Sequence, residues 1–137
     1  MKMTAQIKKG IFYLGGEPVF LVTADYPYYR DDAGNWDDRL KKIKNAGIDT
    51  VTFYTPWRHH ARKAGDKIEL DFDGSTQPNR NVKLFLKLCA ENGLWAVVKP
   101  GPYIHAELTF GGLPDWAAGE KGSGGEPLAN DKGEPMV

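Results

Sequence analysis

The sequence predicts an α/β fold in which parallel strands alternate with helices. Three β-branched or apolar runs, at residues 19–24, 48–54 and 94–100, are typical of core strands. Two segments with apolar residues at helical spacing lie between them. Strand, helix, strand, helix, strand is the order of right-handed βαβ units, whose strands are parallel.

The first core strand is expected to follow a turn near the N-terminus. The stretch "GIFYLGGEPVFLVTADY" reads as two strands around Gly15 and Gly16, and the second of these is the run at 19–24. A Gly-Gly pair supplies the positive φ angles that hairpin turns require. The fold should therefore open with a β-hairpin.

The first helix is predicted over residues 35–47. Asn35 can cap its N-terminus, Asp37 and Asp38 favour the positive end of the helix dipole, and Gly47 can end it in a left-handed conformation. The apolar residues that share one face are Trp36, Leu40 and Ile43.

The second helix is predicted over residues 79–93, where Gly93 ends it. The side chains expected to point inward are Val82, Phe85, Leu86 and Cys89. Cys89 is the single cysteine, which excludes an internal disulfide and favours the role of a small buried apolar residue.

The connections between these elements differ in length. Each helix passes to the next strand through a minimal turn, whereas each strand passes to its helix through a long segment rich in Tyr, Trp, His and Pro. In α/β folds the C-terminal strand ends carry ligand sites. The long segments therefore place any site at one end of the sheet.

Composition and motifs exclude several classes of function. Eighteen basic and eighteen acidic residues cancel, so no net charge favours nucleic acid or an anionic membrane. No signal peptide or membrane span is recognisable, which predicts a cytoplasmic location. His59 and His60 have no acidic partner at metal-ligand spacing, and no phosphate-binding glycine motif occurs, so neither a metal nor a cofactor is expected.

Aromatic and charged side chains gather at the three strand ends. Carbohydrates present C–H faces that pack on aromatic rings and hydroxyl groups that pair with planar polar groups. This clustering indicates a carbohydrate as the partner. The residues concerned are Asp25, Tyr28, Arg30, Tyr54, Trp57, His60, Tyr103, His105, Glu107, Phe110 and Trp116.

Three stretches give this pattern a specific resemblance. "NWDDRLKKIKNAGIDTVTFYTPWRHH", "LDFDG" and "FLKLCAENGLWAVVKPGPYIHAELTFGGLPDW" resemble, in that order, the N-terminal part of the catalytic barrel of glycoside hydrolase family 35. That family comprises β-galactosidases and related exo-glycosidases. The resemblance implies a (β/α)8 TIM barrel, of which this chain would form the first βαβαβ part.

The resemblance also implies roles for individual residues. The family's Tyr in Y-x-P-W falls on Tyr54, and its Ala-Glu in G-P-Y-x-x-A-E falls on Ala106 and Glu107. These residues would bind the non-reducing sugar, with Glu107 contacting hydroxyl groups and doing no acid–base work. The further substrate-binding candidates are Trp57, His60 and Tyr103.

The chain departs from the family pattern at several positions. Residues 27–30 read P-Y-Y-R where the family usually has H-Y-f-R, residues 57–62 read W-R-H-H-A-R in place of W-n-x-H-E-P, and Leu108 replaces a usual Trp. These changes leave the sugar open between a galactoside, a glucosaminide and another β-glycoside.

Retaining glycosidases need two carboxylates about 5–5.5 Å apart. In the family both come from later strands, so no catalytic residue is expected in this segment and the chain alone should be inactive. Residues 1–137 would form the N-terminal portion of an incomplete barrel, with 117–137 as a flexible Gly/Pro-rich loop or tail. Open strand edges would then favour a homo-oligomer.

Two other interpretations remain. The same aromatic face could serve a non-catalytic carbohydrate-binding or interaction module. Alternatively, the chain could be a small doubly wound α/β domain.

Overall fold

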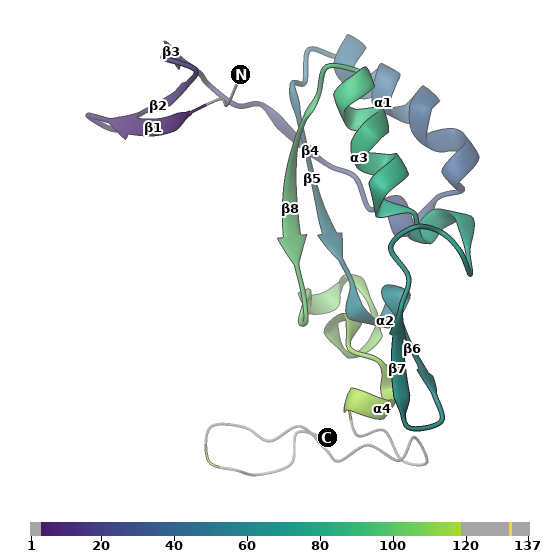
Figure 1. Cartoon of the computed structure of the whole chain (residues 1–137). Helices are drawn as coiled ribbons and strands as arrows, with labels where there is room; N and C mark the ends of the chain where they lie inside the picture. The colour runs from purple at the N-terminus through teal and green to yellow at the C-terminus, as the bar shows by residue number, and fades with distance from the viewer. Residues whose placement is uncertain (1–3, 119–131, 133–137) are drawn as a thin grey trace.

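The computed structural model describes residues 4–118 and 132, and it begins with a small antiparallel sheet (Figure 1). This sheet has the order β1-β2-β3, and its strands are β1 (Ala5–Lys8), β2 (Ile11–Leu14) and β3 (Glu17–Pro18). The predicted turn is confirmed, because Gly15 and Gly16 join β2 to β3 with φ angles of 60° and 97°. Strand β1 was not predicted.

A parallel sheet of order β4-β5-β8 forms the centre of the molecule. Its strands are β4 (Thr23–Asp25), β5 (Thr50–Thr55) and β8 (Trp95–Pro100). The predicted parallel arrangement is confirmed. The first core strand is shorter than expected, because Val19 still donates a backbone hydrogen bond to Phe12 of the N-terminal sheet. Residues 19–22 thus link the two sheets.

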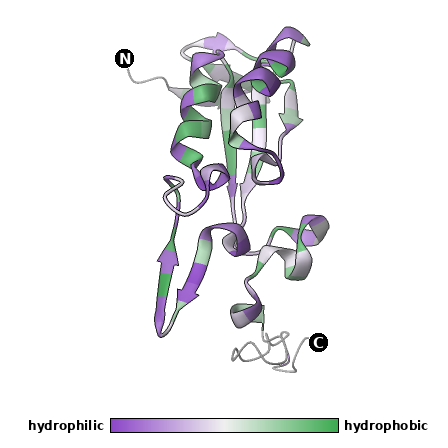
Figure 2. Ribbon diagram, turned by 90° about the vertical axis from the view of Figure 1, so that its right-hand side faces the viewer, coloured by the Kyte–Doolittle hydropathy of each residue, from purple (hydrophilic) through white to green (hydrophobic). Residues whose placement is uncertain are grey.

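The two long helices, α1 (Trp36–Asn45) and α3 (Val82–Glu91), pack over the same face of the parallel sheet (Figure 1). The core between them centres on aromatic rings, and Phe85 contacts Trp36 and Phe53 edge-on at centroid distances of 5.3 Å and 5.0 Å. Figure 2 shows broad hydrophobic stretches on α3 and the central strands. One inward prediction is wrong: Leu86 is exposed, because it lines an open hollow between α3 and the start of β8.

The helix ends are only partly as predicted. Asn35 does not cap α1; its side chain donates to Asp31, while Asp32 accepts from the backbone of Gly34 in the preceding 3-10 turn η2 (Ala33–Asn35). Asn81 caps α3 by accepting from the Leu84 amide at 2.9 Å. Both helices end as predicted at glycines with positive φ, at positions 47 and 93.

The long connections hold short elements of their own. Between β5 and α3 lie α2 (Trp57–His60), the hairpin of β6 (Ala61–Ala64) and β7 (Lys67–Leu70), and the 3-10 turn η3 (Pro78–Arg80). The hairpin was not predicted, and it is mostly hydrophilic (Figure 2). The turn η1 (Tyr28–Arg30) follows β4.

After β8 come η4 (His105–Glu107), η5 (Thr109–Gly112) and α4 (Asp115–Ala118). Of the predicted tail at 117–137, the first two residues belong to α4, and all but residue 132 of the remainder lies outside the described residues. Figure 1 shows that α2, the hairpin and the segment after β8 all lie beyond the same end of the parallel sheet.

Candidate functional site

A small hollow of about 90 Å³ lies where the three parallel strands end. Strands β4 and β5, the turn η1 and the turn η4 all contribute to its wall. Of the eleven strand-end residues named from the sequence, four line this hollow, namely Asp25, Arg30, Tyr54 and Glu107, and the other seven do not. The lining residues are Asp25, Tyr26, Pro27, Tyr29, Arg30, Thr52, Phe53, Tyr54 and Glu107.

Tyr54 stands near the end of β5, half-buried, with its ring covered on one side by a cation. The Nζ atom of Lys99 lies 4.1 Å from the centre of the ring. Tyr54 and Lys99 are partners in the β5–β8 register, so strand pairing itself places the ammonium group there. A cation over an aromatic face is attractive and restrains the ring.

Asp25 ends β4 on the same face of the sheet. Its Oδ1 atom accepts from Lys99 Nζ at 2.7 Å and from the hydroxyl of Thr52. The hydrogen bond from Lys99, followed by that from Thr52, holds the pKa of the Asp25 carboxyl below its ordinary value. Asp25 therefore stays ionised and bound to Lys99 around neutral pH.

Glu107 closes the hollow from the segment after β8. Its backbone carbonyl accepts a hydrogen bond from the guanidinium of Arg30 in η1, which ties the two loops together. Among the residues that the structure describes, none forms a hydrogen bond or ion pair with the Glu107 carboxylate, and the side chain is exposed. The group is thus open to a ligand. The side chain of Ala106 lies outside the described part of the chain.

Two of the further candidates lie beside the hollow and do not line it. Trp57 begins α2 and packs edge-on against Trp116, with ring centroids 5.0 Å apart. Tyr103 is 59% exposed and lies over Gly111, where a Cβ atom would overlap its ring. Both residues belong to segments that follow strand ends, Trp57 after β5 and Tyr103 after β8.

His60 has a different place, inside the core. Its Nδ1 atom donates to the backbone carbonyl of Asp71 and its Nε2 atom accepts from the Tyr28 hydroxyl, each at 2.5 Å. Burial lowers the pKa of His60 to about 4. The neutral ring joins η1 to the β6–β7 hairpin and does not line the hollow.

Asp71 shapes the loop that follows this hairpin. Its carboxylate accepts backbone hydrogen bonds from residues 73 to 76 at 2.7–3.2 Å and a further one from the Thr76 hydroxyl. Burial alone would raise the pKa of the Asp71 carboxyl, but the hydrogen bonds, with those from Thr76 the largest, hold it well below its ordinary value. A buried carboxylate therefore organises the backbone of this loop.

Sequence reasoning did not assign Lys99, Thr52 or Tyr29 to the site. Lys99 and Thr52 lie within strands, and only the register shows that they reach the same face as Tyr54. Tyr29 adjoins the core residue Tyr28, and the sequence cannot say which of two adjacent phenols faces a hollow.

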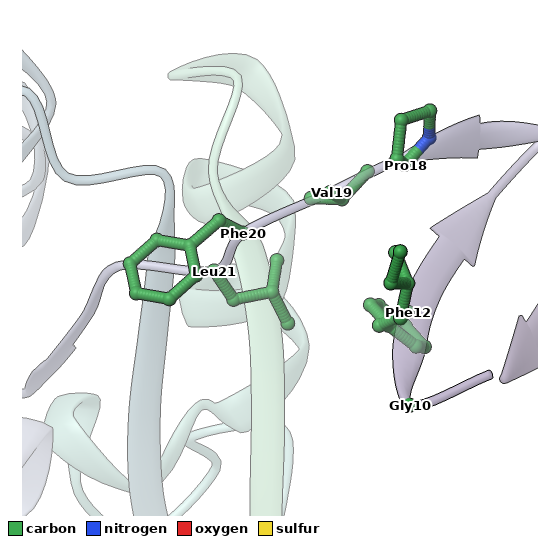
Figure 3. A pocket seen from close by; sticks show the side chains of 7 residues that line it. Gly10, Phe12, Pro18, Val19, Phe20 and Leu21 are labelled. Atoms are coloured by element: carbon green, nitrogen blue, oxygen red, sulfur yellow. The ribbon is translucent and has the colours of Figure 1, made fainter. Parts of the chain in front are cut away.

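A larger hollow of about 550 Å³ lies between the N-terminal sheet and the linker to β4 (Figure 3). Its wall carries no charged side chain, and Phe20, one of its lining residues, is 88% exposed. It offers apolar contact but no group for polar recognition. The lining residues are Gly10, Ile11, Phe12, Pro18, Val19, Phe20 and Leu21.

Within 4–118 and at 132, no group of three or more His, Cys, Asp or Glu side chains could hold a metal ion. In the same part of the chain, no helix combines the length and the apolar character needed to cross a membrane.

The sequence is similar to several curated proteins. It is 43% identical over 105 residues to a β-1,2-glucosyltransferase of Ignavibacterium album, covering 77% of this chain and 14% of that one. It is 39% identical over 132 residues to an exo-β-D-glucosaminidase of Thermococcus kodakarensis, covering 92% and 16%. It is 36% identical over 117 residues to human β-galactosidase-1-like protein 2, covering 85% and 17%.

Among solved structures, an endocellulase of Pyrococcus horikoshii in complex with cellotetraose matches at 13% identity and a TM-score of 0.47, over 70% of this chain and 30% of that one. The chain thus spans only 14% to 17% of the length of the curated relatives named above. The model of the glycosyl hydrolases family 35 matches residues 11–125. The chain therefore belongs to the glycosyl hydrolases of family 35.

Proposed function

We propose that this chain forms part of the sugar-binding site of a retaining exo-β-glycosidase of the β-galactosidase type. The observation that carries the proposal is the meeting of Tyr54 and Glu107 in one hollow at the ends of parallel strands. An aromatic ring beside an open carboxylate is suited to a sugar, since the ring packs on C–H groups and the carboxylate accepts from hydroxyl groups.

The proposed scaffold is the first part of a (β/α)8 barrel. The parallel strands follow one another in chain order, and both long helices cover the same face. A doubly wound domain reverses its strand order and places helices on both faces. Sequential order with one-sided helices supports the barrel, whose ligand sites lie at the C-terminal strand ends.

Within this site we assign binding, not bond cleavage, to the described carboxylates. A general acid needs a raised pKa to stay protonated near neutral pH. Asp25 has the opposite shift, because Lys99 and Thr52 stabilise its charged form. Glu107 is placed to accept hydrogen bonds from a sugar. The two carboxylates that perform hydrolysis would come from other strands of a complete barrel.

For the sugar, we propose a terminal β-linked hexose, with a β-galactoside as the first candidate. The names of the relatives include a β-galactosidase-1-like protein, an exo-β-D-glucosaminidase and a β-1,2-glucosyltransferase. All three names specify a β linkage, and each names a different sugar. Galactosides, glucosides and glucosaminides are therefore the ligands to compare.

The test is saturation-transfer NMR on the full chain with methyl β-D-galactoside, methyl β-D-glucoside and methyl β-D-glucosaminide. At least one should bind, with a dissociation constant in the millimolar range that corresponds to about −4 kcal/mol. Glu107→Gln should weaken binding about tenfold or more, because hydrogen bonds to a charged group are stronger than those to a neutral one. Glu91→Gln, an equivalent change on the exposed end of α3, serves as the matched control.

Failure of the wild-type chain to bind all three glycosides would contradict the proposal. So would equal affinity of the wild type and Glu107→Gln.

A further inference from the structure

Three tyrosines follow β4 closely in the stretch "DYPYYR", and their hydroxyl groups are in different situations. The Tyr26 hydroxyl donates to Asp31 Oδ2 at 2.8 Å, and the Tyr28 hydroxyl bonds to His60 Nε2 at 2.5 Å. The Tyr29 hydroxyl is buried, and within the described part of the chain it has no hydrogen-bond partner. Two of the phenols are thus satisfied by the fold and one is not.

The burial of Tyr29 makes this difference costly. Its side chain is only 7% exposed, and its ring packs edge-on against Tyr28 at a centroid distance of 5.6 Å and lies beside His59 at 5.9 Å. A buried hydroxyl without a partner destabilises the folded chain relative to a bonded one. A phenylalanine would fill the same space without that cost. The packing of the fold therefore does not account for a hydroxyl group at this position.

The position of Tyr29 indicates a role in binding a ligand. Tyr29 lines the same hollow as Tyr54 and Glu107. Burial raises the pKa of the Tyr29 phenol, and the charges of Arg30, Glu107 and Lys99 also act on it. The phenol thus stays protonated and able to donate, and it lies among the charged groups that surround the hollow.

We propose that the Tyr29 hydroxyl is a specificity-determining group of this site, which forms a hydrogen bond with one particular hydroxyl of the bound sugar. This inference rests on the proposed function. The hydroxyl is enclosed, but the Glu107 side chain in the same wall is long and exposed and can move as a sugar enters. A site built to bond a hydroxyl rejects an analogue without it, since the buried polar group then stays unpaired.

Tyr29→Phe tests the inference in two independent ways, and the first is stability. Removal of an unpartnered hydroxyl should leave the midpoint of urea unfolding unchanged or raise it, whereas Tyr28→Phe should lower it because the bond to His60 is lost. A clear loss of stability in Tyr29→Phe would show that the hydroxyl has a partner in the folded chain, and this would overturn the inference.

The second test is sugar binding by the full chain, with the tightest of the three methyl β-glycosides and its deoxy analogues. Tyr29→Phe should raise the dissociation constant about three- to tenfold, as expected for one neutral hydrogen bond. One deoxy analogue should bind the wild type more weakly by a similar factor and bind Tyr29→Phe without further loss. Tyr13→Phe, on the N-terminal sheet, should bind every ligand as the wild type does.

The outcomes separate the two proposals. If the wild type binds no glycoside, the proposed function fails and the inference falls with it. If the wild type binds and Tyr29→Phe binds equally well, the inference alone fails. It also fails if Tyr29→Phe loses the same factor for the parent and every deoxy analogue, because the residue would then only position Glu107.

Discussion

At the scale of single residues, the charged and polar groups of the chain divide between those that hold the fold and those that stay open. His60 and Asp71 are buried and hydrogen-bonded to other parts of the fold, and both hold strand-to-helix connections in place. Glu107 and Tyr29 lack side-chain partners within the described residues and meet in one hollow. We therefore assign a structural role to the first pair, and the proposed binding role falls to the second pair, which lines a concave surface.

Because His60 is one of the groups that hold the fold, it should make the stability of the chain depend on pH. Burial lowers its pKa from 6.5 to about 4, so the folded chain resists protonation that the unfolded chain accepts. Its contribution to stability is complete above about pH 6.5 and is lost as the pH falls towards 4. The free energy of unfolding, measured by urea titration, should decrease across that window. His60→Gln should be less stable and show a shallower decrease.

A slope that persists fully in His60→Gln would contradict this account. Burial also lowers the pKa of His59, so a part of the slope should remain.

At the scale of elements, the segment after β8 holds Glu107 in place by folding back on itself. The Ile104 amide donates to the Gly111 carbonyl at 2.7 Å, and Arg58 of α2 donates to the Leu113 carbonyl at 3.0 Å and pairs with Asp115. Ile104 itself is buried in the core. The position of Glu107 thus depends on how closely this segment packs.

Gly111 is the position in this segment that leaves the least room for a side chain. Its φ angle is +59°, and a Cβ atom there would overlap the Tyr103 ring. Gly111→Ala should therefore lower the free energy of unfolding by about 3 kcal/mol, combining backbone strain with overpacking. Gly10→Ala has a similar φ of +78° but open space around it, so strain alone should cost about 1 kcal/mol.

Chemical denaturation of both variants checks this, and equal losses would mean that the Tyr103 contact is unimportant. Gly111→Ala should also weaken glycoside binding, whereas Gly10→Ala should not.

The sequence predicted the elements that have periodic apolar patterns and missed those that do not. Strands β5 and β8 and both long helices follow directly from their spacing. The β6–β7 hairpin was not predicted, because most of its residues are exposed and it lacks an alternating apolar pattern. Gly65 and Asp66 are nevertheless typical turn residues. For the site, the motifs located Tyr54 and Glu107, but the role of Lys99 depends on strand register and that of Tyr29 on burial, which no local pattern encodes.

At the scale of the whole molecule, the parallel sheet is covered on one face and open at an edge. Strand β8 pairs with β5 alone among the described residues, and Trp95, Val97 and Val98 are between 41% and 44% exposed. An edge strand with exposed apolar side chains is a template for further strand pairing. We therefore expect copies of the chain to associate through β8.

Val98→Lys should suppress this association, since a charge on an edge strand blocks pairing. The register pairs Val98 with Phe53, so the substitution lies on the opposite face from the Tyr54 side chain and should leave glycoside binding intact. Sedimentation velocity over a concentration series should show association of the wild type and none of Val98→Lys. Phe20→Lys, which removes a still more exposed apolar group outside any strand, should associate like the wild type.

A wild type that stays monomeric at every concentration would contradict the role of this edge. So would an equal effect of Phe20→Lys.

The hydrogen bond between Arg30 and the Glu107 carbonyl joins residues 77 positions apart in the chain. Synthesis proceeds from the N-terminus, so Asp25, Tyr29 and Tyr54 leave the ribosome well before Glu107 does. Until then, the hollow lacks the wall that carries Glu107, and with it the Glu107 carboxylate, even if the first strands have already paired. A nascent chain of this protein should therefore remain unable to hold a sugar until translation has passed the segment after β8, and ligand could stabilise only chains beyond that length.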